Sequence, residues 1–226
     1  MSEGAVNNTS GETDQENSTN SRRYFLIQAT SAVAAVGAVG AAWPFIKYWT
    51  PSAKARAAGA PVKIDFSKLS PGEMLSPIVA WRGKPIFVVY RDQPSIDSLE
   101  TDSGGLADPD STNPEQQPDF AVNPWRSERP EIGVYVGICT HLGCAPTYRP
   151  DKDGVEQNWP GGFFCSCHGS KFDFAGRAFK GVPAPINLEV PPHTFTGPDT
   201  LVIGRSPTAE ERGRIASEFN VKEWMA

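Results

Sequence analysis

The chain has 226 residues, a formal net charge of −5 and 39% hydrophobic residues, enough to bury the core of one or two domains. Because only 21% of the residues are charged and 10% are aromatic, we exclude a chain that is disordered throughout. The acidic balance also lacks the basic surface that nucleic-acid binding requires, so we exclude nucleic acid as a partner.

The N-terminal part combines a polar tail with a long apolar segment. Residues 1–20 are rich in Ser, Thr, Asn, Gly and Glu, which predicts a disordered tail. Residues 24–46 then run for 23 residues without a charge. A helix of that length extends roughly 35 Å and can span a bilayer. A buried core helix and a cleaved signal peptide are the alternatives, but the length favours a retained transmembrane anchor within residues 21–49.

Two arginines stand directly before this apolar segment. Arg22 and Arg23 belong to the run SRRYFL, which resembles a twin-arginine export signal, although two ordinary anchoring charges are the alternative. Loop charges do not decide the orientation, because Lys47, Lys54 and Arg56 follow the segment. On this resemblance we expect a single-pass protein of the bacterial inner (plasma) membrane, with the following domain on the periplasmic side.

Residues 50–61 connect the anchor to the rest of the chain. They are mostly small and show no apolar periodicity, which predicts a hinge linker. Their alanine content also permits a helical continuation of the anchor, and the sequence does not choose between the two.

The head domain is expected over residues 62–204. Short runs of β-branched and aromatic residues alternate with turns rich in Gly and Pro, which predicts an all-β fold of antiparallel strands. The predicted strands are Lys63–Phe66, Ile78–Trp81, Ile86–Tyr90, Val134–Ile138, Phe163–Phe164, Leu188–Val190 and Leu201–Ile203.

One segment of the head is strongly acidic. Residues 92–119 contain eight acidic residues and neither Lys nor Arg, in a setting rich in Pro, Ser and Gly. We interpret this segment as a solvated surface insertion, with a docking surface for a basic partner as the alternative.

A helical extension is predicted over residues 205–226. Ser206 reads as the N-cap and Pro207 as the first helical residue, because proline is favoured at that position. Ile215 and Phe219 would then share one face of a short helix, with Trp224 nearby.

All four cysteines and two of the three histidines lie in two short boxes, CTHLGC at 139–144 and CSCHGS at 165–170. A structural zinc site is the simplest reading, and the composition alone leaves both metal binding and a disulfide open. Zinc knuckles, however, more often supply a CxxC pair each. The spacing CxH followed by CxxH instead matches a site in which two cysteines and two histidines share two irons.

The two boxes resemble those of the Rieske iron-sulfur proteins of cytochrome bc complexes. The resemblance extends to the twin-arginine anchor, the linker, the strand pattern and residues 181–185, which are similar to the proline loop of that family. It implies an all-β Rieske-type head of antiparallel sheets with a cluster-binding subdomain, carried on a single N-terminal transmembrane helix.

The resemblance also implies one [2Fe-2S] cluster per subunit and assigns its ligands. Cys139 and Cys165 would bind the inner iron, and His141 and His168 would bind the outer iron. By the same resemblance His168 is the catalytic ligand that accepts a hydrogen bond from quinol, and His141 is the other exposed ligand.

The remaining residues of the boxes receive roles only from the resemblance. Cys144 and Cys167 would form a disulfide that joins the boxes, two free thiols being the alternative. Ser170 matches a serine that donates a hydrogen bond to a bridging sulfide. Phe172 departs from the family pattern, in which a tyrosine is common. His193 lies outside both boxes and is expected in a surface loop.

The resemblance therefore implies a subunit of a multisubunit enzyme, a quinol:cytochrome c oxidoreductase. The subunit would take one electron from quinol and pass it to a c-type cytochrome, beside a cytochrome b subunit, in a dimeric complex. The alternatives are the Rieske subunit of an exported molybdenum oxidase of the arsenite oxidase type, a soluble Rieske ferredoxin and a zinc-stabilised binding domain. The anchor, the linker and the two additional cysteines favour the first.

Overall fold

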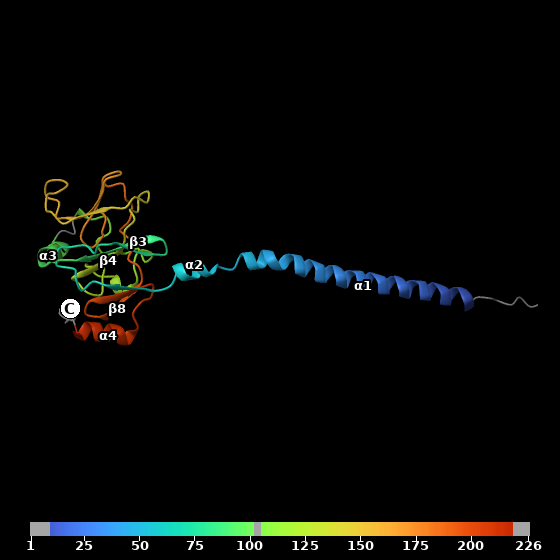
Figure 1. The fold of residues 1–226 in the computed structure, drawn as a ribbon. Helices are drawn as coiled ribbons and strands as arrows, with labels where there is room; N and C mark the ends of the chain where they lie inside the picture. The colour runs from blue at the N-terminus through green and yellow to red at the C-terminus, as the bar shows by residue number, and fades with distance from the viewer. Residues whose placement is uncertain (1–9, 102–104, 219–226) are drawn as a thin grey trace, which may run out of the picture. The chain divides into compact units, whose positions relative to one another are not determined.

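The computed structural model describes residues 10–101 and 105–218, and the chain divides into the units Met1–Ala55 and Arg56–Ala226. The main element of the first unit is helix α1 (Ser10–Tyr48), drawn in blue in Figure 1. Within Ser21–Ala57 an 18-residue window has a mean hydropathy of 1.7, and the stretch is long and apolar enough to cross a membrane. Phe219 and Trp224, expected on and beside the C-terminal helix, lie outside the described residues.

Helix α1 begins earlier than the sequence predicts. Residues 10–20 were expected in a disordered tail, but their backbone is helical. Once a helix is nucleated, each added residue gains a backbone hydrogen bond, so the apolar segment extends into its polar flank. A short helix α2 (Ala53–Ala58) also lies inside the expected linker, which matches in part the helical alternative for that segment.

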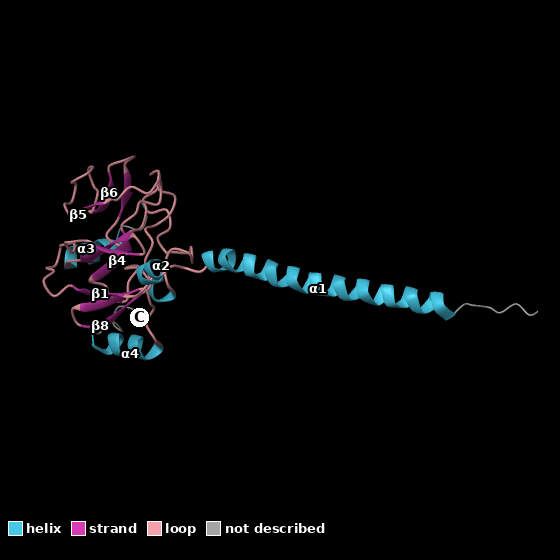
Figure 2. Ribbon diagram, turned by 45° about the vertical axis from the view of Figure 1, so that its right-hand side comes forward, coloured by secondary structure: helices cyan, strands magenta, loops and turns pink. Residues whose placement is uncertain are grey.

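The head contains three antiparallel sheets of three strands each, within the described residues. The first sheet has the order β1 (Val62–Asp65), β9 (Thr200–Ile203), β8 (His193–Gly197). The second has the order β2 (Val79–Trp81), β3 (Lys84–Tyr90), β4 (Ile132–Val136). The third has the order β5 (Thr147–Arg149), β6 (Gly162–Cys165), β7 (Ser170–Phe172). In Figure 2, β5 and β6 lie at one end of the head and β8 at the other, with β4 between them.

The second sheet is buried on both faces. One face packs against the first sheet through Ile86, Val88, Val134 and Val136. The opposite face packs against the third sheet through Phe87, Val89 and Tyr135. Side chains alternate between the two faces of a strand, so a strand covered on both sides must be apolar at nearly every position. This requirement explains the uninterrupted apolar runs at 86–90 and 132–136.

The predicted strands overlap the observed ones with one exception. Leu188–Val190 is wrong as a strand, because its amides bond to irregular segments instead of a strand ladder. The Leu188 N–H donates to the Gly176 carbonyl, and the Val190 N–H donates to the Gln116 carbonyl. Strands β5, β7 and β8 were missed since each carries polar or charged residues.

The described parts of the acidic segment, residues 92–101 and 105–119, pack against the head and are not a solvated insertion. It begins with helix α3 (Gln93–Thr101), whose Ser95 amide is capped by the Asp92 carboxylate at 3.0 Å. Ile96 and Leu99 are buried in a cluster that includes Trp125. The prediction was wrong because the apolar residues, three apart, are separated by charged and polar ones that hide the helical period.

Helix α4 (Ala209–Glu218) begins two residues later than expected. The Glu211 amide donates to Thr208 Oγ1 at 3.2 Å, and the Thr208 amide donates back to the Glu211 carboxylate at 2.9 Å. This reciprocal capping box makes Thr208 the N-cap, so the assignment of Ser206 is wrong. Ile215 is buried in the core that the first and second sheets share, as its predicted face requires.

His193 is fully buried, which corrects the expected surface position. It is the first residue of β8, and the alternation of that strand points both His193 and Phe195 inward. Its Nδ1 lies 2.8 Å from the Pro191 carbonyl, and the ring contacts Phe120 edge-on. Burial lowers the pKa of His193 from its ordinary 6.5 to about 4, so the side chain is neutral at pH 7.

This burial predicts acid lability. Between pH 6.5 and about 4 the unfolded chain binds a proton at His193 that the folded chain does not, so stability falls as the pH falls through this window. The loss amounts to about 3 kcal/mol by pH 4. In His193→Phe, urea unfolding of the full chain in detergent should show a weaker decline over this window. If the free energies of unfolding of His193→Phe and the wild type differ by the same amount from pH 7 to 4.5, the lowered pKa of His193 is contradicted.

Candidate metal centre

The two cysteine boxes form loops with the same backbone turn. In the first, which follows β4, the Cys139 carbonyl accepts the Gly143 N–H at 3.0 Å. In the second, which joins β6 to β7, the Cys165 carbonyl accepts the Gly169 N–H at 2.9 Å. Both glycines have positive φ, 84° and 78°, which residues with a Cβ rarely adopt. Each loop therefore turns back four residues after its first cysteine.

The loops direct thiols inward and imidazoles outward. Cys139 and Cys165 are 2% and 1% exposed and belong to the core beneath the second sheet. His141 is half-buried and His168 is exposed. The two imidazole rings lie with their centroids 4.8 Å apart and nearly perpendicular. The structure thus brings the two imidazoles together, and also the two thiols, from loops that are distant in sequence.

Cys144 and Cys167 are joined by a disulfide, with an S–S distance of 2.12 Å. The bond links the two loops across 23 residues of sequence. A sulfur in a disulfide has no thiolate to offer a metal. Although Cys144, Cys165 and Cys167 form a compact sulfur group, the thiols that can bind metal among the described residues are Cys139 and Cys165.

Two further observations fit a bound metal group at this position. The Nδ1 atom of His141 is buried and has no hydrogen-bond partner within the described part of the chain. Buried polar atoms are normally paired, so an unpaired imidazole nitrogen suits a metal ligand. Burial raises the pKa of the Cys165 thiol, while backbone N–H groups of Cys167 and His168 oppose that rise by favouring the thiolate.

Residues 181–186 form hydrogen bonds with both cysteine loops. The Thr140 hydroxyl donates to the Ile186 carbonyl at 2.6 Å, directly between the expected ligands of the first box. The Ala184 N–H donates to the Ser170 hydroxyl oxygen at 3.0 Å. Ser170 is fully buried, and its hydroxyl hydrogen remains available to donate. The role of Thr140 was missed by sequence reasoning, because no spacing rule marks a hydroxyl that bonds to a distant carbonyl.

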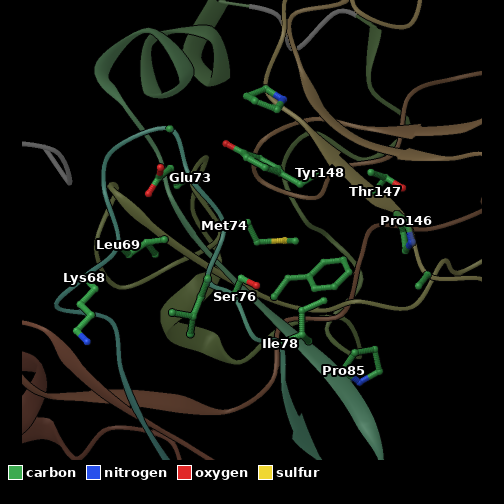
Figure 3. A pocket seen from close by; sticks show the side chains of 15 residues that line it. Lys68, Leu69, Glu73, Met74, Ser76, Ile78, Pro85, Pro146, Thr147 and Tyr148 are labelled. Carbon is green, nitrogen blue, oxygen red and sulfur yellow. The ribbon is translucent and has the colours of Figure 1, made fainter.

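A groove of about 740 Å³ lies beside the first box but does not contain the site. Figure 3 shows its labelled side chains, which include Met74, Ile78, Pro146 and Tyr148. None of the four expected ligands lines it. The candidate centre is therefore formed by two loop tips and not by a groove.

Two family models match the sequence of this chain. Residues 111–192 match the model described as "Rieske [2Fe-2S] domain", and residues 12–52 match "Ubiquitinol-cytochrome C reductase Fe-S subunit TAT signal". The fold and the site thus define a Rieske [2Fe-2S] protein with an N-terminal membrane anchor.

Named relatives cover nearly the whole chain. A ubiquinol-cytochrome c reductase iron-sulfur subunit of Allochromatium vinosum is 52% identical, over 85% of this chain and 90% of that protein. The same subunit of Blastochloris viridis is 46% identical, over 81% and 92%. A chain of a hyperthermophilic respiratory complex III has 26% identity and a TM-score of 0.43, over 76% of this chain and 96% of that chain. On the strength of its sequence relatives, the chain belongs to the ubiquinol-cytochrome c reductase iron-sulfur subunits.

This membership confirms the predicted family, fold class, cofactor and function as an iron-sulfur subunit of a quinol:cytochrome c oxidoreductase. The molybdenum-oxidase, ferredoxin and zinc-domain alternatives are not supported. The individual ligand assignments remain predictions.

The disulfide generates the first prediction for this site. A bond that closes a loop of this length stabilises the folded state by about 3 kcal/mol, mainly because it restricts the unfolded chain, and here it also joins the two loops. Replacing both Cys144 and Cys167 by Ser should lower the fraction of protein that carries a cluster, without changing the type of its electron paramagnetic resonance (EPR) signal. Cys139→Ser is the comparison, because it should abolish the signal. Equal iron loss in both proteins would contradict the assignment.

A second prediction concerns Phe172, which is fully buried in the same core as Cys139 and Cys165. Tyrosine at this position adds a hydroxyl that can donate to a ligand sulfur and favour the reduced cluster. We expect Phe172→Tyr to raise the midpoint potential by tens of millivolts, at about 59 mV per tenfold change in the one-electron equilibrium. Phe174→Tyr is the control, since Phe174 packs in a separate cluster. A redox titration at one pH that shows an unchanged or lower midpoint for Phe172→Tyr would count against this role.

Proposed function

We propose that Cys139, His141, Cys165 and His168 are the four ligands of the cluster and that His168 is the residue that meets the substrate. The observation that carries this proposal is the pairing of two buried free thiols with two neighbouring imidazoles that reach the surface. A [2Fe-2S] cluster bound there supplies a one-electron redox centre.

The side chains at the surface determine what the chain can do with a quinol. His168 is exposed, so its imidazole can accept a hydrogen bond from a quinol hydroxyl and take up the proton that leaves with the electron. His141 is less exposed and helps to define the contact surface. The thiols stay dry beneath them, which keeps water away from the most strongly charged ligands.

The relatives and the signal match support the proposed partners and location. Those relatives are named as subunits that act in ubiquinol-cytochrome c reductase, so we infer a cytochrome b subunit and a c-type cytochrome as neighbours in a dimeric complex. The match to an export signal supports a head on the periplasmic side of the bacterial inner membrane. The division of the chain near Ala55 supports residues 50–61 as a hinge between the anchor and the head.

The three histidines of the chain provide a direct test. In purified membranes, His168→Asn and His141→Asn should each lose the Rieske EPR signal and quinol:cytochrome c activity. His193→Phe should retain both, because His193 is buried away from the boxes. The wild-type complex should also contain b-type and c-type haems. A wild-type complex without haem, or an intact signal in His168→Asn, would refute the proposal.

A further inference from the structure

Residues 181–186, which bond to both boxes, are followed by a segment that bonds to a residue of the acidic segment. Gln116 is 4% exposed, and its side-chain Oε1 accepts the Asn187 N–H at 3.0 Å. Its backbone carbonyl accepts the Val190 N–H at 2.8 Å. Gln116 therefore fixes the chain at two points immediately after residues 181–186.

Gln116 is itself held firmly in place. Arg126 is fully buried and directs its guanidinium to carbonyl and amide oxygens, among them Gln117 Oε1 at 3.1 Å and the Ala175 carbonyl at 3.2 Å. The Gln116 carbonyl lies 3.5 Å from the same guanidinium. Burial lowers the pKa of Arg126 only to about 10, so the group stays charged at pH 7 and its hydrogen bonds are charge-assisted. The acidic segment thus attaches to the turn that follows the second box.

The hydrogen bonds of Gln116 are connected to Ser170 through residues 181–187. Asn187 directly follows the stretch 181–186, whose Ala184 N–H donates to Ser170 Oγ at 3.0 Å. A hydroxyl that accepts a fixed N–H has a restricted direction for its own hydrogen. On the proposed function, that hydrogen is donated to a sulfur of the bound cluster, and a well-directed donor favours the reduced state.

We propose that Gln116 is a positioning residue that sets the direction of the Ser170 hydroxyl through residues 181–187 and thereby raises the midpoint potential of the cluster. Gln116 lies in the acidic segment, outside both boxes. The inference rests on the proposed function and extends it to a residue that has no spacing relation to the ligands.

The chain offers a matched pair of variants to test this role. Gln117 is a neighbouring buried glutamine, 6% exposed, whose side chain bonds to Arg126 and to the Ser111 and Asn113 carbonyls but not to residues 181–187. Gln116→Met and Gln117→Met make the same chemical change at similar burial. Both should destabilise the protein, and only Gln116→Met should move the midpoint.

The measurement is an EPR-monitored redox titration of the full-length subunit in isolated membranes. For Gln116→Met we expect a threefold to tenfold fall in the equilibrium constant for reduction, a midpoint lower by about 30 to 60 mV. Gln117→Met should titrate as the wild type. Should Gln116→Met fail to accumulate, the shorter Gln116→Asn replaces it, and a smaller shift in the same direction is expected. An unchanged midpoint, or equal shifts at both positions, would overturn the proposal.

A double variant tests the route through Ser170. In a Ser170→Ala background the hydroxyl is absent, so Gln116→Met should no longer shift the midpoint. Fully additive shifts would refute this route. A wild-type subunit without a Rieske EPR signal would instead refute the proposed function, so the two failures are distinguishable.

Discussion

The double-sided burial of the second sheet is the constraint on which the rest of the head depends. A three-stranded sheet has too little surface to form a core alone, and covering both of its faces requires a second layer on each side. The first sheet supplies one layer, and the two ligand loops with their small sheet supply the other. The cysteines that face the candidate centre therefore belong to the hydrophobic core, and their positions are as rigid as the packing around them.

The redox chemistry of the site depends on the charge of its ligands and on the hydrogen bonds around them. Thiolates carry charge and imidazoles are neutral, so a site that replaces two of four thiolates by imidazoles holds less negative charge and accepts an electron more readily. Neighbouring hydrogen bonds then tune the potential. Backbone N–H groups of Cys167 and His168 bond to the Cys165 sulfur, and on the proposed function the Ser170 hydroxyl is a further donor. The disulfide keeps the two loops together without taking up a ligand thiol.

The sequence was most informative where one physical pattern dominates. The apolar run 86–90 predicted a strand, and the two cysteine and histidine boxes carried the resemblance that supplied the expected ligands. The sequence was least informative where long-range packing overrides a local signal. His193 looked polar and exposed, yet the inward face of β8 buries it. Likewise, the charges of segment 92–119 concealed the apolar contacts of α3 and the hydrogen bonds of Gln116.

The pairing of the first and last strands of the head has a consequence for biogenesis. Val62 in β1 lies opposite Ile203 in β9, so the first sheet cannot close until almost the whole chain has been synthesised. Until then β1 lacks its partner and presents an open edge, which favours aggregation. Threading such a chain across a membrane during synthesis would separate the two strands. A route that moves the head only after it has folded, as a twin-arginine type signal provides, removes that conflict.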